Sequence, residues 1–182
     1  IVDELNSSDG KEHTFDWLYH NKGQDVECDM PRIEAIPGEL PAGYSYMKDI
    51  RSFSADGTKP VSVRFLNDQV ASHLTMMSIP GDIVFTATGP LSSIVERTPL
   101  AIVRRKGNQV SFISVLEPVE EGKPADIRSV EMIPGNTLTI RISRIEGEDL
   151  VNFENGNHGI FSVTCKTESG ETLVMKSESD KE

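Results

Sequence analysis

Short runs of alternating apolar and polar residues recur along the chain, and they constrain the fold more than any other feature. The clearest example is residues 61–65, followed more loosely by residues 83–86 and their flanks, and short strand-like runs return at intervals of about 8–12 residues. Such alternation places successive side chains on opposite faces of a β-strand. No stretch keeps an apolar face at the helical period over three turns. The sequence therefore predicts an all-β fold, an antiparallel β-sandwich of roughly ten to twelve strands.

Length and charge narrow the class of protein further. A chain of 182 residues suits one domain, which we predict over residues 1–176, with a charged tail at 177–182. The net charge of −11 argues against a nucleic-acid partner, because such proteins carry a basic surface that displaces counterions. No apolar run reaches the roughly 18 residues of a membrane span. The chain starts at Ile1 in strand-like sequence without Met, so we expect it to be part of a longer protein.

Residues 13–21 form the most distinctive predicted strand, with the single tryptophan and two of the four histidines. One face carries His13, Phe15, Trp17 and Tyr19, and the other carries Thr14, Asp16, Leu18 and His20. Two interpretations stay open. The aromatic side chains fill a core while the polar face meets solvent, or Trp17 and Tyr19 form a platform at a carbohydrate site.

Turn residues predict how the strands are connected. Asp9-Gly10 suits a tight turn and predicts a hairpin over residues 1–21. A second hairpin is predicted from strands 100–105 and 110–116, with its turn at 106–109. Residues 25–43 contain three prolines and two glycines, which predicts a long irregular loop.

The basic run Arg104-Arg105-Lys106 falls at the tip of the second predicted hairpin. A solvated turn is the simpler interpretation. The alternative is an ion pair with a carboxylate of another domain, because the arginine fork matches a carboxylate in a bidentate way.

Motifs for nucleophilic catalysis, phosphate binding and metal binding are missing from the sequence. Neither Cys28 nor Cys165 has a histidine next to it, and two cysteines leave open whether they pair or stay free. On a regular strand His13 faces away from Asp16 and His20, so these three residues are not expected to ligate one ion.

Two segments together resemble the C-terminal β-domain of the heparinase II/III-like polysaccharide lyases. Residues 14–23 match the pattern T-F-D-W-L-x-H-x-x-G, and residues 104–118 carry R-R-K-G followed by F-x-S-V-L-E-P. The likeness extends from Ile1 to about Ile145. It implies a helical toroid before the β-domain and an active site in the cleft between them.

The resemblance also implies the chemistry of the complete enzyme, which is β-elimination on a uronic acid. A base removes the proton next to the carboxylate while neighbouring side chains neutralise that carboxylate. The base residues and zinc ligands of the family lie in motifs that this sequence lacks. We therefore expect no catalytic residue, no metal and no cofactor in this chain.

The resemblance leads to further expectations about partners and location. The missing toroid is the expected partner, and an acidic polysaccharide is the expected substrate of the full-length enzyme, which is secreted or periplasmic. His20, Asn21 and Trp17 are the candidate substrate-binding residues. Two alternatives remain, a free-standing carbohydrate-binding or adhesion module and a structural sandwich unrelated to glycans.

Overall fold

The computed structural model describes residues 1–34, 38, 40–120, 122–153, 161–166 and 169–176. Fifteen strands and a 3-10 helix at Ala42–Tyr46 occur in this part of the chain. The predicted all-β class is therefore confirmed, with more strands than the ten to twelve expected. The tail predicted at 177–182 lies outside the described residues.

The chain divides into two compact units, Ile1–Pro124 and Ala125–Glu182. This division falls inside the single domain that the sequence predicts over residues 1–176. The resemblance described above covers the whole of the first unit and only the beginning of the second.

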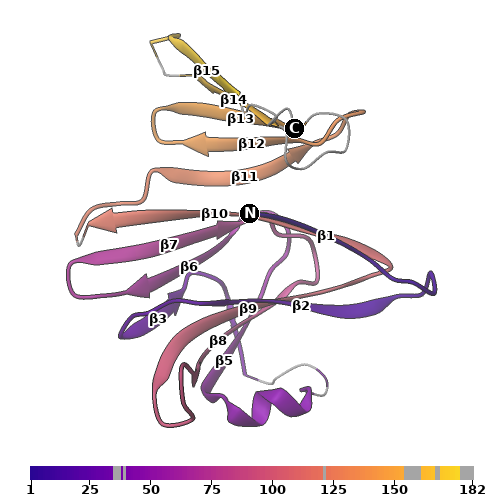
Figure 1. Cartoon of the computed structure of the whole chain (residues 1–182), viewed down its shortest axis with the longest axis vertical. Helices are drawn as coiled ribbons and strands as arrows, with labels where there is room; N and C mark the ends of the chain where they lie inside the picture. Colours follow the sequence, from indigo (N-terminus) through magenta and orange to yellow (C-terminus); the bar gives the residue numbers. More distant parts are fainter. Residues whose placement is uncertain (35–37, 39, 121, 154–160, 167–168, 177–182) are drawn as a thin grey trace, which may run out of the picture. The chain divides into compact units, whose positions relative to one another are not determined.

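The first unit is a sandwich of two antiparallel sheets (Figure 1). The first sheet has the order β1 (Val2–Asn6), β10 (Gln109–Glu120), β7 (Val70–Met76), β6 (Val61–Leu66), β3 (Asp25–Cys28). The second sheet has the order β2 (His13–His20), β9 (Arg97–Gly107), β8 (Ile83–Pro90), β5 (Lys48–Ser54), β4 (Arg32–Ile33).

Apolar side chains from both sheets meet in an inner core. The alternating residues of β6 illustrate its origin, because Val61, Val63 and Phe65 are buried while Ser62 and Arg64 point the other way. The inner core also contains Leu74, Met76, Phe112, Val84 and Val103. Burial of this apolar surface is the main term that stabilises the sandwich.

The second sheet buries its outer face as well. The 3-10 helix places Tyr44 over this face, where it packs with Phe85, Ala87, Leu100 and Ile102. Strand β9 lies between two neighbours and is covered on both sides, so it is buried almost continuously from Thr98 to Arg105. Buried strands of this kind read as nearly continuous apolar runs rather than as an alternation.

Both predicted hairpins are wrong. Strand β1 pairs with β10 in the first sheet, whereas β2 pairs with β9 in the second sheet. The connections β1–β2 and β9–β10 therefore cross from one sheet to the other instead of closing hairpins. A turn signal is local and reports a change of direction, but it does not report which sheet the next strand joins.

The irregular loop predicted over residues 25–43 is wrong in part. Residues Asp25–Cys28 form β3 along the edge of the first sheet, and Arg32–Ile33 form the short β4 in the second. The described remainder includes the start of the 3-10 helix. Prolines lie beside these short strands rather than inside them, which is compatible with pairing at a sheet edge.

The second unit is an antiparallel sheet whose strands follow one another in chain order. These are β11 (Ile127–Ile133), β12 (Thr139–Arg144), β13 (Gly147–Phe153), β14 (Phe161–Lys166) and β15 (Thr172–Lys176). One face carries a cross-strand row of apolar residues: Met132, Ile140, Val151, Val163 and Met175. The other face carries ion pairs that join Arg141 to Glu131 and Glu148.

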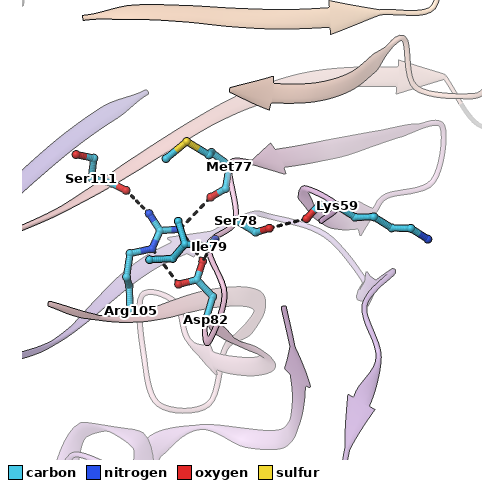
Figure 2. Close-up of polar contacts among 7 residues, drawn as sticks. All are labelled: Lys59, Met77, Ser78, Ile79, Asp82, Arg105 and Ser111. Atoms are coloured by element: carbon cyan, nitrogen blue, oxygen red, sulfur yellow. Dashed lines mark hydrogen bonds and ion pairs between the residues drawn. The ribbon is translucent and has the colours of Figure 1, made fainter. Parts of the chain in front are cut away.

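The inner core of the first unit also holds a fully buried ion pair between Arg105 of β9 and Asp82 (Figure 2). The Arg105 Nε and Nη2 atoms donate to the two Asp82 carboxylate oxygens at 2.9 and 2.6 Å. Further Arg105 donors reach the carbonyl oxygens of Met77, at 2.9 Å, and Ser111. The guanidinium thus links β9 to the β7–β8 turn and to β10.

This pair corrects the expectation for the basic run. Arg104 and Arg105 are only 6% and 2% exposed, so the solvated turn is wrong for both. Their carboxylate partners belong to the same unit of the chain, not to another domain. The side chains of β9 alternate between the two faces of the sheet, so the two arginines occupy different layers.

Removal of the Asp82 carboxylate should destabilise the fold strongly. We expect Asp82→Ala to lower the free energy of unfolding by about 3–5 kcal/mol, because it leaves the buried Arg105 guanidinium without its carboxylate counter-charge. Chemical denaturation would measure the change. Asp9→Ala is the matched control, since it removes a carboxylate that makes an exposed side-chain hydrogen bond with His13. Equal effects of the two substitutions would contradict a central role for the buried pair.

Candidate functional site

The structure places Trp17 on the inner face of β2, half-buried against the inner core. Its indole Nε1 donates a hydrogen bond of 2.7 Å to Asp3 Oδ2. The indole ring is nearly parallel to the ring of Tyr19, with the two planes 8° apart and the ring centroids at 6.0 Å. Tyr19 in turn meets Phe65 of the first sheet edge-on. The two rings are therefore engaged in packing between the sheets.

Asn21 and His20 lie at the end of the same strand but face different ways. The Asn21 backbone is bonded to β9, because its N–H donates to Pro99 O and its carbonyl accepts from Thr98 Oγ1 at 2.6 Å. Its side-chain Nδ2 donates to Tyr19 Oη at 3.3 Å. His20 is exposed on the opposite face. The three predicted substrate-binding residues are thus not brought together on one surface.

The polar group that the structure does assemble lies on the outer face of the second sheet. Arg104 Nε and Nη2 donate to the Asp16 carboxylate at 2.7 and 2.8 Å, and Tyr44 Oη donates to Asp16 Oδ2 at 2.7 Å. The Arg104 guanidinium also lies over the rings of Tyr44 and Phe85, at 5.5 and 5.2 Å from their centroids. Asp16, Tyr44 and Arg104 form what we call the outer triad.

The sequence offers a partial signal for this triad. Asp16 and Arg104 occupy directly opposed positions of β2 and β9, and both lie in the segments that carry the family resemblance. Tyr44 falls in the predicted loop, where no strand pattern indicates its position. Only the folded chain brings it over the sheet.

Electrostatics hold the triad in one protonation state. Burial by itself raises the pKa of Asp16, but the hydrogen bonds from Arg104 and Tyr44 outweigh it and keep the pKa below its usual value. Burial and the bond to Asp16 raise the pKa of Tyr44, so this phenol stays protonated at neutral pH. A tyrosine base needs the opposite shift. The triad is therefore suited to holding strands together rather than to abstracting a proton.

A cavity of about 460 Å³ lies beside the triad. Asp16 and Arg104 contribute to its wall, together with Thr14 and the exposed Lys106 of the adjoining cross-strand pair. Since Arg104 is already bonded to Asp16, Lys106 is the cation here that is left to meet a ligand.

The structure shows the state of the two cysteines and whether the described residues include a group that could bind a metal ion. Cys28 and Cys165 are free, and burial raises the pKa of Cys28 to about 12, which keeps this thiol protonated. No group of three or more His, Cys, Asp or Glu side chains that could hold a metal ion occurs in the part of the chain described. Nor does that part contain a helix long and apolar enough to cross a membrane.

Comparisons with known proteins add nothing to the geometry. No protein-family model matches the chain, and no curated protein matches it.

Substitution of Trp17 should measure how much the inner face of β2 contributes to stability. We expect Trp17→Ala to lower the free energy of unfolding by about 3–5 kcal/mol, because it empties a large aromatic site and breaks the bond to Asp3. The control is Leu18→Ala on the same strand, whose side chain points to the outer face and is 46% exposed. Denaturant melts that show similar small shifts for both variants would contradict the packing role.

The lowered pKa of Asp16 predicts a specific pH dependence of stability. A carboxyl group whose pKa is lower in the folded state adds stability above its unfolded pKa of about 3.9. This contribution is lost as the pH falls through the folded pKa. The stability difference between the wild type and Asp16→Asn should therefore be largest near neutral pH and shrink in acid. A difference that is constant down to pH values well below the unfolded pKa would contradict it.

Proposed function

We propose that the chain is the C-terminal β-domain of a heparinase II/III-like polysaccharide lyase, which supports the catalytic helical domain and is inactive alone. The family resemblance of residues 14–23 and 104–118 suggests the family. The contacts of these two segments support the structural role within it.

The observation that carries the proposal is the direct bonding between the two segments. Strands β2 and β9 pair along their whole shared length, from His13 opposite Gly107 to His20 opposite Leu100. Across this ladder the bidentate contact joins Asp16 of the first segment to Arg104 of the second. Residues that are far apart in the sequence and resemble one family therefore act as one structural unit.

The same contacts explain why the chain alone should be inactive. β-Elimination needs a free cation to neutralise the substrate carboxylate and a base for the adjacent proton. Arg104 and Arg105 both have carboxylate partners, and the phenol of Tyr44 stays protonated, so the outer triad and the buried pair supply neither group. The base and the neutralising groups would then come from the helical toroid that we propose as the partner.

The proposal extends to the setting of the complete protein. Its substrate would be an acidic polysaccharide that contains uronic acid, and it would work as a secreted or periplasmic enzyme. The strongly negative charge of the chain is compatible with this role only if cations at specific positions meet the substrate.

Incubation with polysaccharides tests the proposal directly. The chain alone should produce no unsaturated uronate from heparin, heparan sulfate or alginate, as measured by ultraviolet absorbance. The complete gene product, assayed in parallel, should produce it from one of these substrates or a related uronate polymer. Activity that stays with the isolated chain through repurification would show that it carries its own base. A complete protein without a helical domain would contradict the family assignment.

A further inference from the structure

A row of ionisable side chains crosses the outer face of the first sheet, on the opposite side of the sandwich from the outer triad. The strand registers place Glu27 of β3 opposite Arg64 of β6, Arg64 opposite His73 of β7, and His73 opposite Glu117 of β10. The row is separate from the outer triad, and neither motif segment contains Arg64.

Arg64 differs from Arg104 and Arg105 in its hydrogen bonding. Its Nε atom is buried but donates no hydrogen bond within the described part of the chain. No described carboxylate lies within ion-pair distance of its guanidinium, although Glu27 is its cross-strand neighbour. A buried donor without an acceptor is costly, so such groups in native proteins ask for an explanation. One such explanation is a ligand that supplies the missing hydrogen-bond acceptor.

Two hollows meet at Arg64, and both are lined by polar groups. The first has a volume of about 380 Å³, and Glu27, Asp29 and Ser62 contribute to its wall with Arg64 and His73. The second has a volume of about 280 Å³, and its wall includes Gln24 and Asp68 besides Arg64. Arg64 therefore stands between two neighbouring spaces along the outer face of β6.

The chemistry of these walls selects a class of ligand. The guanidinium is a fork that matches a carboxylate, while the carboxylates and the amide around it are acceptors and donors for hydroxyl groups. His73 is half-buried; burial and then the charge of Arg64 lower its pKa, while Glu117 and Asp29 oppose the shift. The imidazole is therefore neutral at pH 7 and can donate one hydrogen bond and accept another.

Other ligand classes fit less well. A polyphosphate would place several negative charges against Glu27, Asp29 and Asp68, whereas a simple amine would meet the guanidinium of Arg64. A molecule with one carboxylate and many hydroxyls satisfies both kinds of group. The net charge of −11 weakens the approach of an anion, but salt screens distant charges over about 8 Å and leaves a direct contact with Arg64 largely intact.

We propose that a uronate-containing oligosaccharide binds along the outer face of β6, with a carboxylate on Arg64 and hydroxyl groups in the two hollows. The choice of an acidic glycan rests on the proposed function, but binding to the isolated chain is independent of catalysis. Binding by the chain, with or without lyase activity of the complete protein, therefore separates the two proposals.

The experiment measures binding of a tetrasaccharide of alternating glucuronate and N-acetylglucosamine to the wild-type chain by calorimetry and by NMR. The matched ligand is the same tetrasaccharide with its carboxylates reduced to alcohols. The matched variants are Arg64→Gln and Arg32→Gln, the latter at an exposed arginine of the second sheet.

The wild type and Arg32→Gln should bind the acidic tetrasaccharide equally. Arg64→Gln and the reduced ligand should each lower the affinity on the order of tenfold or more, because a charge-assisted hydrogen bond is lost. No binding by the wild type, equal binding of the reduced ligand, or full affinity in a folded Arg64→Gln variant would each overturn the proposal.

A folding defect of Arg64→Gln would not leave the question open. The NMR titration of the wild type locates the ligand by the amides whose shifts change. Changes confined to β3, β6 and the neighbouring residues of β7 would support the site. Changes that centre on the second sheet, around Lys106 or His20, would overturn it and place glycan binding there.

Discussion

Two consecutive arginines on a strand that is buried on both faces set the conditions for the rest of the sandwich. Because side chains alternate along β9, Arg105 points into the inner core and Arg104 points to the outer face. A guanidinium charge removed from water needs an opposite charge and hydrogen-bond acceptors close by. The fold must therefore deliver a carboxylate to each face at the same level of the strand.

The inner carboxylate comes from a turn whose shape is itself well defined. Asp82 follows Gly81, which has a φ of +92°, a value that side-chain-bearing residues rarely adopt. Asp82 Oδ2 accepts a hydrogen bond from the Ile79 N–H, and the Asp82 carbonyl accepts from the Ala55 N–H. The β7–β8 turn and β9 are thus tied to one buried charge, and Ala55, which follows β5, is bonded to the backbone of the same aspartate. The outer carboxylate is Asp16 of β2. It accepts a hydrogen bond from Tyr44, whose ring packs on the outer face of the second sheet.

The sequence predicts those features that depend on local alternation. The all-β class and the shared face of Phe15, Trp17 and Tyr19 follow from period two. The structure confirms the all-β class and packs that face against the inner core, which is the first of the two interpretations. The pairing of strands does not follow, because Asp9-Gly10 and the turn at 106–109 mark changes of direction that a crossing between sheets satisfies as well as a hairpin does. The burial of Arg104 and Arg105 could not be predicted either. Their burial depends on carboxylates that are distant in the sequence. The charge of an arginine, taken by itself, predicts a side chain that is exposed to solvent.

The location of a ligand site is also not predicted by the sequence motifs. The motifs that suggest a lyase direct attention to β2 and β9, where Arg104 and Arg105 are matched by carboxylates in the fold. A site for an acidic ligand requires the reverse, a cation that the fold leaves without an acceptor. Arg64 meets that requirement on the other sheet, outside both motif segments. The arginines of the family-like segments therefore serve the fold, whereas the arginine whose buried donor lacks an acceptor in the described chain lies on another face of the sandwich.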